Sequence, residues 1–343
     1  MNKKPGILLD HRFFRHAIDL QSAENPERLR SLYRRLDEPF YRKYFQRIPA
    51  RTAPMEAVEA VHSRFYLEQI RSHSHSQDPF SYDRDTYVMA ETLECASLAA
   101  GGCLQMADAI MSGAIDRGFS LVRPPGHHAE PGRGMGFCVL NNVAITAAWL
   151  RRIHGLRRIL VFDFDVHHGN GNQEAFYTNS EVLVFSIHQK DLFPNTGAMA
   201  DLGEGDGLGY TVNIPVFPQY GDEEYTFLAG NVLQAIVEQY MPQIIIASAG
   251  FDGHVDDPIS RTQLTTVWFA TITRLLRRLT LQYCDGRLLM ILEGGYNPVS
   301  LEASALAVLE ALVEPKPQVV GIMPSERAAR LIADHPAKQF WTF

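Results

Sequence analysis

The segment RILVFDFDVHHGNG, residues Arg158–Gly171, is the part of the sequence around which the rest of this chain is organised. Its apolar part, Ile159–Phe162, is the kind of run that predicts a buried strand of a parallel sheet. Polar groups follow at once, because Asp163, Asp165 and His167 come before the closing glycines. In open α/β sheets, ligands bind beyond the carboxyl ends of the strands. The segment therefore predicts a parallel sheet with a binding site at the end of this strand.

The spacing within the segment also predicts a metal site. Side chains alternate between the two faces of a strand, so Asp163, Asp165 and His167 would share one face. Asp165 and His167 could then bind one metal ion from neighbouring positions. The alternative is a buried strand followed by a solvated polar turn. That alternative leaves several ionisable groups at the end of a strand that should be buried, and unpaired buried charge is costly.

Length and composition fit one large globular domain. The chain has 343 residues, of which 46% are hydrophobic and 21% charged. We expect a single catalytic domain over residues 1–343, with its core at about 5–315 and a peripheral segment at 316–343. The net charge of −7 argues against a nucleic-acid-binding protein and is compatible with a cationic substrate.

The four cysteines are scattered without the spacing of a zinc ribbon, which fits a reducing compartment. The sequence offers no signal-peptide pattern and no apolar run that suits a membrane span. We therefore expect a cytoplasmic protein with no membrane partner.

Strand and helix patterns alternate along the chain. The expected strands are Gly6–Leu9, Phe119–Val122, Arg158–Phe162, Val182–Ile187, Tyr210–Ile214, Gln243–Ser248 and Leu288–Leu292. The expected helices are Ala90–Ser112, Asn141–His154, Glu223–Tyr240, Thr265–Leu281 and Ser300–Val313. This alternation predicts an open, mostly parallel, doubly wound α/β sheet with helices on both faces. A charged segment, Asn25–Tyr44, reads as a solvated surface helix; a membrane-binding or partner-binding helix is the alternative.

A second polar cluster follows another expected strand. In RPPGHHA, residues Arg123–Ala129, two prolines stiffen the exit from the strand and two adjacent histidines follow. Imidazole changes its charge near neutral pH, so the pair His127 and His128 suits acid–base chemistry. The glycine-rich stretch Glu130–Phe137 ends in an aromatic residue and lacks the features of a phosphate-binding loop.

Two more strands end in the same way. Residues 244–249 lead to Asp252, and residues 288–292 lead to a glutamate, two glycines and Tyr296. Together, Asp165, His167 and Asp252 offer one nitrogen and two oxygens, which suits a catalytic zinc and also harder divalent ions. The acidic loop around Asp83 could hold a substrate or simply cap a turn. A metal, a histidine pair and a tyrosine predict hydrolysis of an amide or ester, and no GxSxG serine elbow is present.

These residues carry a resemblance to a known family. The motifs are RPPGHHA at 123–129, GFCVLNN at 136–142, DFDVHHGNG at 163–171, AGFDGHVDDP at 249–258 and EGGYN at 293–297. They resemble the histone deacetylase family, which includes bacterial deacetylase-like enzymes and acetylpolyamine amidohydrolases. The resemblance covers roughly 5–315 and implies a sheet similar to that of arginase.

The resemblance also implies roles for individual residues. In the catalytic centre these are the zinc ligands Asp165, His167 and Asp252, the general base His128, its electrostatic neighbour His127, the oxyanion donor Tyr296, and the buried carboxylate Asp163. Around the acyl-lysine tunnel they are the aromatic walls Phe137 and Phe193, the neighbouring Gly136 and Gly295, the gatekeeper Ile259 and the rim residue Asp83. A structural K⁺ or Na⁺ site would use Asp163, Asp165, His167, Ser186 and Ile187, and a second one Phe176, Asn179, Val182 and Tyr210. In the cell, Fe²⁺ or another divalent ion could replace zinc.

Three departures from the family pattern bear on specificity. Asn170 stands where one branch has an aspartate bonded to the second histidine, which places the chain with the class II-like and polyamine-type branch. A neutral partner there would change the basicity of His128. The segment Ser22–Arg28 lacks a histidine–proline pair that often precedes it. Ile259 replaces a glutamate of one polyamine-preferring branch, which weakens but does not remove that preference.

The sequence therefore predicts a zinc-dependent deacylase that acts on acetyl-lysine peptides or on related N-acyl amines. Acetylpolyamines and other small N-acyl amines stay open as substrates, as does a homo-oligomeric state. An arginase-like dinuclear hydrolase would need more carboxylates around a second metal. A non-catalytic acyl-lysine-binding module is the alternative from another class, but both histidines and Tyr296 are present.

Overall fold

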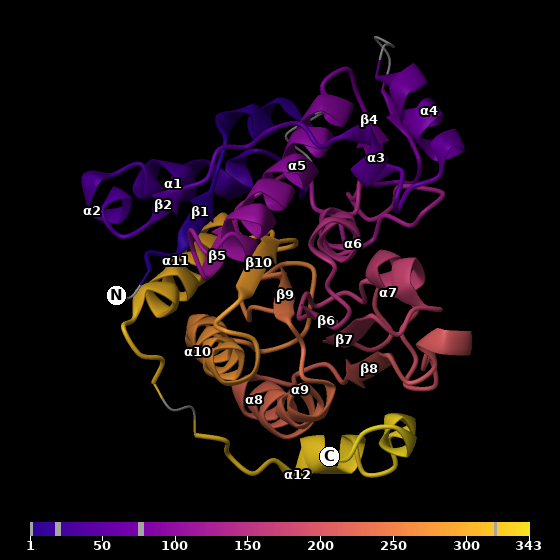
Figure 1. Cartoon of the computed structure of the whole chain (residues 1–343), viewed down its shortest axis with the longest axis vertical. Helices are drawn as coiled ribbons and strands as arrows, with labels where there is room; N and C mark the ends of the chain where they lie inside the picture. The colour runs from indigo at the N-terminus through magenta and orange to yellow at the C-terminus, as the bar shows by residue number, and fades with distance from the viewer. Residues whose placement is uncertain (1–2, 18–21, 75–78, 319–320) are drawn as a thin grey trace.

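An eight-stranded parallel sheet forms the centre of the molecule, with the strand order β2-β1-β5-β10-β9-β6-β7-β8 (Figure 1). The structure is a computed structural model that describes residues 3–17, 22–74, 79–318 and 321–343. The strands of this sheet are β1 (Gly6–Leu8), β2 (Gln46–Arg47), β5 (Arg117–Ser120), β6 (Ile159–Asp163), β7 (Val182–Gln189), β8 (Thr211–Val216), β9 (Ile244–Ala249) and β10 (Leu288–Leu292). A separate antiparallel pair consists of β3 (Phe80–Ser81) and β4 (Tyr87–Val88).

Helices cover both faces of the sheet, as predicted. The α-helices are α1 (Glu27–Leu36), α2 (Pro39–Arg42), α3 (Met55–Val58), α4 (Arg64–His73), α5 (Thr92–Met111), α6 (Asn142–His154), α7 (Asn170–Phe176), α8 (Asp222–Leu228), α9 (Gln234–Tyr240), α10 (Thr266–Tyr283), α11 (Pro298–Val313) and α12 (Glu326–Leu331). The shorter helices are η1 (His11–Arg15), η2 (Gly205–Gly207), the π-helical η3 (Ala229–Leu233) and η4 (Pro336–Gln339). One face carries α5, α6 and α7, and the other carries α11, α10, α8 and α9 (Figure 1).

The central strands are apolar runs with both faces buried. All residues of β6, β9 and β10 are buried, which explains why their sequences lack the alternation of a half-exposed strand. The seven predicted strands all exist, although β5 begins and ends two residues earlier than expected. The two-residue strand β2 was not predicted, because a strand this short has no detectable period.

The order of the strands places a ligand site between β6 and β9. From β6 the chain runs outward to β7 and β8, returns to β9 beside β6, and then continues in the opposite direction to β10. Open α/β sheets bind ligands at such a switch point, outside the carboxyl ends of the strands. Asp163 pairs in register with Ser248. His167 and Asp252 each lie four residues after one member of this pair, so both follow the strands at the same height of the sheet.

The N-terminal helix corrects one prediction. The segment Asn25–Tyr44 was expected to be a solvated surface helix, but α1 is packed into the core. Its buried residues are Arg28, Leu29, Leu32, Tyr33 and Leu36. The apolar residues follow the spacing of a helix with one buried face, and the high charge of the segment conceals this stripe.

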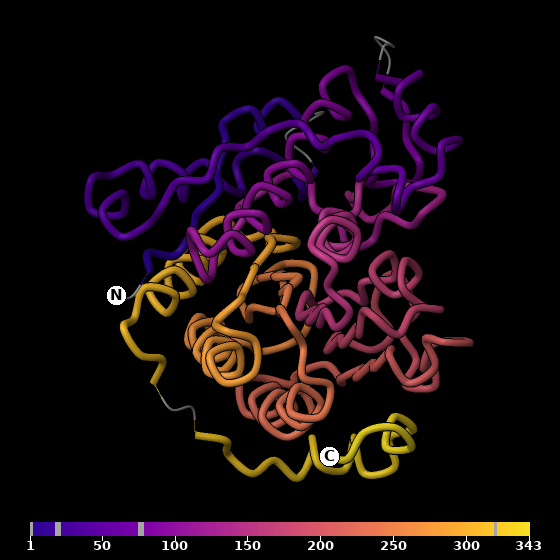
Figure 2. Tube along the Cα trace, viewed as in Figure 1, coloured from indigo at the N-terminus to yellow at the C-terminus, as the bar shows by residue number. Residues whose placement is uncertain are grey.

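The C-terminal segment closes the outer edge of the sheet. Ala328, Ile332 and Ala337 join the hydrophobic core. His335 Nε2 donates to the carbonyl of Asn213 at 2.9 Å, and Trp341 Nε1 donates to the carbonyl of Gly209 at 2.7 Å. The trace in Figure 2 shows this segment passing around the molecule to reach α8 and α9.

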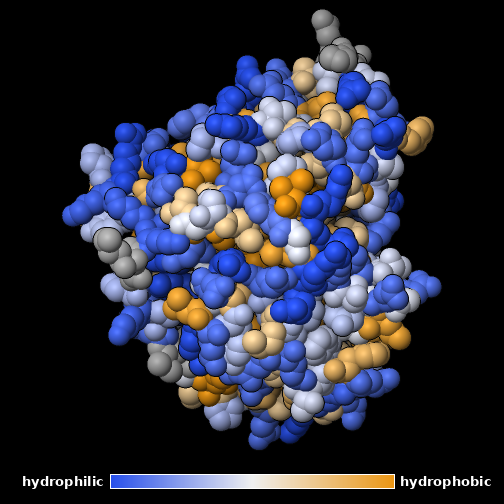
Figure 3. Space-filling view, viewed as in Figure 1, coloured by the Kyte–Doolittle hydropathy of each residue, from blue (hydrophilic) through white to orange (hydrophobic). Residues whose placement is uncertain are grey.

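The face seen in Figure 3 is mostly hydrophilic, with hydrophobic residues in small separate patches. Among the described residues, none of the helices combines the length and the apolar character that a membrane crossing requires.

Candidate active site

Three predicted metal ligands converge at the switch point of the sheet. Asp165 and His167 follow β6, and Asp252 follows β9. The Nδ1 atom of His167 lies 3.0 Å from Asp165 Oδ1 and 3.1 Å from Asp252 Oδ2. The potential ligand atoms of the three residues all lie within 4.8 Å of one another. The structure therefore brings together the residues that local spacing and strand order predicted.

Backbone groups hold the two carboxylates in place. Asp165 Oδ2 accepts a hydrogen bond from the Gly294 amide at 2.8 Å, and Asp252 Oδ1 accepts one from the Val166 amide at 3.1 Å. A Cβ atom at Gly250 would lie 2.0 Å from Asp165 Oδ2, and one at Gly294 would lie 2.1 Å from Asp252 Oδ2. Only glycine leaves room for the carboxylates at these two positions. Such outer contacts are typical of ligands oriented toward a metal.

The charge of this cluster fits a divalent cation. Asp165 and Asp252 are fully buried, and within the described part of the chain their ion-pair partners are all histidines. Burial and the charge of Asp165 raise the pKa of Asp252 to about 7. A divalent cation would remove the penalty of placing two negative charges together. One imidazole nitrogen and two carboxylate oxygens form a donor set that suits zinc with an open coordination position.

The histidine pair lies in the loop that follows β5. His127 Nδ1 is 3.2 Å from Asp163 Oδ2, and His128 Nδ1 is 2.8 Å from Asn170 Oδ1. Burial lowers the pKa of His127, but Asp165 and Asp163 outweigh it and raise the value to about 10. Burial and the neighbouring charges of His127 and His167 hold the pKa of His128 well below its usual value. The surroundings thus move the pKa values of the two imidazoles far apart. Sites that give different proton-transfer roles to similar groups show the same pattern.

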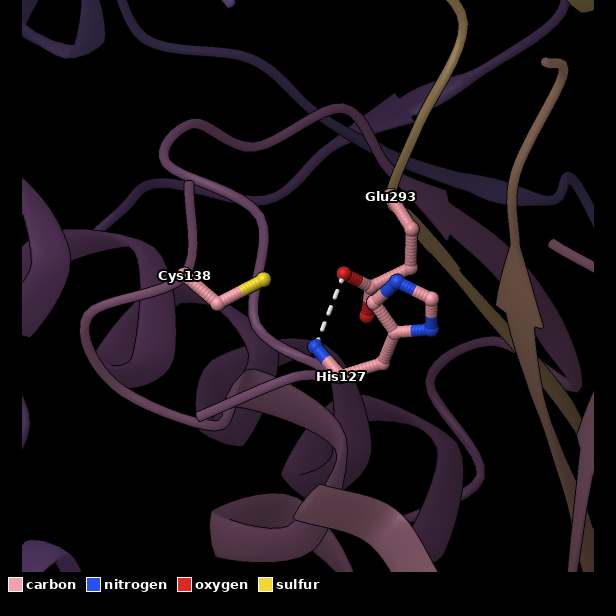
Figure 4. Close-up of side chains that lie close together, drawn as sticks. All are labelled: His127, Cys138 and Glu293. Carbon is pink, nitrogen blue, oxygen red and sulfur yellow. Dashed lines mark hydrogen bonds between the residues drawn. The ribbon is translucent and has the colours of Figure 1, made fainter. Parts of the chain in front are cut away.

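Glu293 connects the end of β10 to the histidine loop. Its Oε2 atom accepts hydrogen bonds from the amides of Gly126 at 2.6 Å and His127 at 3.1 Å. Figure 4 shows the Glu293 carboxylate beside the His127 ring, with the Cys138 sulfur pointing toward it. Sequence reasoning assigned no role to Glu293, although the residue belongs to the quoted EGGYN motif.

A buried ion cluster was also missed from the sequence. Glu24 Oε1 accepts from Arg28 Nη1 at 2.9 Å and from Arg123 Nε at 2.6 Å. Glu24 Oε2 accepts a further hydrogen bond from Arg123 Nη2 at 2.6 Å. Arg28 also donates to the carbonyls of Glu293 at 2.7 Å and Gly295 at 2.6 Å. One carboxylate thus links the histidine loop, through Arg123, to the tyrosine loop, through Arg28.

Tyr296 is held from both sides. The guanidinium carbon of Arg28 lies 4.7 Å from the centre of the Tyr296 ring. The Tyr296 amide donates to Asp257 Oδ2 at 2.7 Å, a contact that sequence reasoning also missed. Gly295 has a φ of +121°, a conformation that a residue with a side chain rarely adopts, and it turns the chain sharply before Tyr296. Burial raises the pKa of the Tyr296 hydroxyl, so it stays protonated and can donate a hydrogen bond.

A cavity of about 520 Å³ leads to His167. Its lining residues are Ala23, Asp83, Arg84, Asp85, Gly136, Phe137, His167, Leu192, Phe193 and Ile259. The ring centre of Phe193 lies 5.1 Å from that of His128, and the ring centre of Phe137 lies 5.4 Å from that of Tyr296. The predicted tunnel residues Asp83, Gly136, Phe137, Phe193 and Ile259 therefore surround one cavity beside the metal cluster, whereas the predicted Gly295 is not among its lining residues.

The rim residue Asp83 has a structural contact beyond its predicted role. Its Oδ1 atom accepts from the Thr86 amide at 2.6 Å, and its Oδ2 atom accepts from the Gly136 amide at 3.1 Å. The Phe137 amide donates to Thr86 Oγ1 at 2.9 Å, and Phe137 has a φ of +68°. The acidic loop thus supports the wall of the cavity at Phe137.

The residues expected at the two monovalent-cation sites lie around β6, β7 and β8. Asp163 pairs in register with Ser186, whose hydroxyl lies 2.9 Å from His188 Nδ1. At the second site, the carbonyl of Phe176 accepts from the Asn179 amide, and that of Tyr210 accepts from the Val184 amide. Each of these carbonyls keeps a second lone pair for another partner.

Comparisons with known proteins agree with this geometry. The family model for the histone deacetylase domain matches residues 22–312. The chain is 37% identical to a probable deacetylase of Archaeoglobus fulgidus, over 85% of this chain and 81% of the relative. It is 38% identical to the human polyamine deacetylase HDAC10, over 92% of this chain and about half (49%) of that longer relative.

A solved structure supports the same assignment. The crystal structure of the HDA15 HD domain superposes with a TM-score of 0.91 at 33% identity, over 99% of this chain and 95% of that chain. The predicted deacetylase-like sheet is therefore confirmed. The chain belongs to the histone deacetylase family and is a hydrolytic deacetylase.

Proposed function

We propose that the chain is a zinc-dependent deacylase that removes an acetyl group from acetyl-lysine or a related N-acyl amine. The observation that carries this proposal is the convergence of Asp165, His167 and Asp252 beside a cavity with two aromatic walls. A linear acylated amine fits such a cavity, because the aromatic rings of Phe137 and Phe193 can pack against an aliphatic chain. The acyl group would then reach the metal cluster.

Zinc would be held by Asp165, His167 and Asp252. When bound, it would supply Lewis acidity that polarises the substrate carbonyl and lowers the pKa of a water molecule. The surrounding residues of this chain would orient the substrate, exclude water and move protons.

His128 would act as general base and then as general acid. Its Nδ1 atom donates to Asn170 Oδ1, which leaves the lone pair on Nε2 free to accept a proton from the attacking water. The same Nε2 proton would be given to the leaving nitrogen, so that the products are a carboxylate and a free amine. His127, bonded to Asp163 and with a raised pKa, would stay protonated as a nearby positive charge.

Tyr296 would donate a hydrogen bond to the oxygen on which negative charge develops. Its raised pKa keeps the proton on the hydroxyl, and Arg28 and Asp257 fix the loop that carries it. A donor that is oriented before the reaction stabilises the transition state more than water can.

The substrate could be a protein lysine or a polyamine. Ile259 gives the entrance no negative charge at the gatekeeper position, which favours acyl-lysine, whereas the relation to a polyamine deacetylase supports the alternative. The four cysteines are free and buried, which supports a reducing, cytoplasmic location. The carbonyls near β6 to β8 would hold structural K⁺ or Na⁺.

A substrate panel tests this proposal. The zinc-loaded chain would be assayed with acetyl-lysine peptides, acetylated polyamines and longer acyl-lysines, with Asp252→Ala as the control. Turnover of one of these substrate classes by the wild type, with no turnover by Asp252→Ala, would support the proposed deacylase. If zinc-loaded protein left every substrate intact, the catalytic proposal would be wrong and the acyl-lysine-binding module would be favoured.

A further inference from the structure

The side-chain amide of Asn170 has defined partners at both ends. Asn170 Oδ1 lies 2.8 Å from His128 Nδ1, and Asn170 Nδ2 donates to Glu130 Oε1 at 2.7 Å. The same Nδ2 atom also lies 3.3 Å from the carbonyl of His128. Met135 Sδ is a third acceptor of Nδ2 at 3.3 Å, and the carboxylate of Glu130, with the shortest hydrogen bond, is the strongest of the three.

The orientation of this amide decides the tautomer of His128. In the observed orientation Asn170 offers its oxygen to His128, so Nδ1 carries the proton and Nε2 carries the lone pair. In the flipped orientation the amide would present N–H groups to Nδ1, and the proton would have to move to Nε2. His128 would then lack the lone pair that a general base needs. An asparagine can adopt either orientation, so something else must choose between them.

We propose that Glu130 is a positioning residue that locks the amide of Asn170 and thereby fixes the catalytic tautomer of His128. This inference rests on the proposed role of His128 as general base. In the flipped orientation the carboxylate of Glu130 would face the amide oxygen, and two acceptors 2.7 Å apart would repel each other. The flipped amide is therefore disfavoured at the Glu130 end, whereas the His128 end could accept it by a change of tautomer.

The position of Glu130 permits a clean substitution. Its side chain is 21% exposed, and its second partner is the more exposed Arg133, whose Nε donates to Oε2 at 2.9 Å. The contacts that hold this stretch of chain use the backbone: the Glu130 amide donates to the Arg133 carbonyl, and the Glu130 carbonyl is bonded to His62 Nδ1. Changing the side chain leaves these backbone contacts in place.

The mechanism predicts opposite effects in two backgrounds. An aspartate at 170 has two equivalent oxygens and needs no orienting partner, and its second oxygen would face Glu130 with like charge. Glu130 should therefore help the enzyme when residue 170 is asparagine and hinder it when residue 170 is aspartate. A merely structural role for Glu130 would have the same sign in both backgrounds.

The experiment measures kcat and KM of the full-length, zinc-loaded protein. The variants are Glu130→Ala and Glu130→Gln, each alone and combined with Asn170→Asp, with Arg133→Ala as the matched control. With Asn170 present, Glu130→Ala should lower kcat about tenfold at unchanged KM. Glu130→Gln should largely restore kcat, because its oxygen can still accept from Asn170, and Arg133→Ala should match the wild type.

The double variant Glu130→Gln, Asn170→Asp should have a higher kcat than Asn170→Asp alone. The proposal is overturned if Glu130→Ala keeps the wild-type kcat, or if its loss is the same in both backgrounds. The ¹⁵N shifts of the histidine side chains supply a readout that does not depend on activity. They should report His128 protonated at Nδ1 in the wild type and a mixture of tautomers in Glu130→Ala. If the wild type is inactive but shows these ¹⁵N shifts, the proposed function is wrong and this inference stands. If Glu130→Ala shows the same ¹⁵N shifts as the wild type, this inference is wrong and the proposed function stands.

Discussion

Two clusters of buried charge lie at the carboxyl end of the sheet, and they are built differently. In the first, Glu24 is matched by the guanidinium groups of Arg28 and Arg123, with hydrogen bonds of 2.6 to 2.9 Å. In the second, Asp165 and Asp252 share the imidazole of His167. Both clusters are buried, but only the first has enough positive charge of its own.

The difference separates a structural cluster from a chemical one. Burial alone would raise the pKa of Glu24, but Arg123 and Arg28 outweigh it and lower the value to about 2. Burial and the charge of Asp165 raise the pKa of Asp252 to about 7, and the hydrogen bond and charge of His167 offset only part of this rise. A buried carboxylate that the protein itself leaves uncompensated indicates a site for an external cation.

Removing a ligand from the cluster of Asp165, His167 and Asp252 should abolish the activity. Asp252→Ala takes away one of the three donors, so the protein should lose both the catalytic zinc and turnover, while its fold is kept. Elemental analysis of the purified variant and an activity assay check this. Full zinc occupancy in Asp252→Ala would show that the ligand set is wrong.

Removing the hydroxyl of Tyr296 should spare the metal but slow the reaction. Tyr296→Phe should lower kcat by about 10²–10³, the loss typical of a missing oxyanion donor. Zinc content should stay at the wild-type level, because Tyr296 is no ligand. Tyr44→Phe, at an exposed position, is the control and should behave as the wild type. Near-normal turnover of Tyr296→Phe would contradict the assigned role.

Breaking the cluster of Glu24, Arg28 and Arg123 should lower the stability of the folded chain. Glu24→Ala leaves two buried guanidinium groups without their carboxylate, and we expect a loss of about 3–5 kcal/mol in the free energy of unfolding. The control is Glu27→Ala, which removes an exposed ion pair with Arg30 and should cost less than about 1 kcal/mol. Denaturant unfolding of the apo-proteins measures both. Equal losses in the two variants would remove the distinction between the clusters.

Acid should destabilise the folded chain in two overlapping ranges of pH. Burial and Arg123 lower the pKa of His16 to about 4, and burial lowers that of His62 to about 4. The unfolded chain binds these protons near pH 6.5, so the free energy of unfolding should fall as the pH drops from about 6.5 to 4. Glu24 extends the loss from about pH 4.5 toward 2, because its stabilising charge disappears as it is protonated.

Urea midpoints measured across this range check the pH prediction. His62 shows why protonation should destabilise the folded chain. Its Nε2 atom accepts a hydrogen bond from the Asn141 amide at 2.9 Å and would lose this bond when protonated. His62→Gln should flatten the slope between pH 6.5 and 4. The same slope in His62→Gln as in the wild type over that interval would contradict the assignment of a neutral, buried His62.

The sequence predicted those features that depend on local pattern. The apolar runs located seven strands, and the spacing of Asp165 and His167 placed two ligands on one loop. Asp252 followed from the rule that parallel strands end at one edge of the sheet. The strands and the meeting of these three side chains agree with the predictions, because each depends on a period or a strand end that can be read within a few residues, and their role as zinc ligands stays a prediction.

The rest depends on partners that are distant in sequence. Glu24 and Arg123 lie 99 residues apart, and Glu293 reaches the His127 amide across 166 residues. The high charge of the segment around Arg28 suggested a solvated helix, because sequence alone does not show that a buried carboxylate and backbone carbonyls will pair with that arginine. The link from Glu130 to Asn170 was likewise hidden, since it requires the loop after β5 to meet the first residue of α7.

The difference between the two clusters matters most if Asp165, His167 and Asp252 hold one catalytic zinc ion, as we propose. Titrating the metal-free protein with zinc, while measuring deacetylation of an acetyl-lysine peptide and of an acetylated polyamine, tests it most directly. Turnover of one of these substrates should rise from background to a plateau at one equivalent of zinc per chain. A plateau that needs two equivalents, or full turnover without added metal, would rule out a single catalytic zinc ion at these three residues.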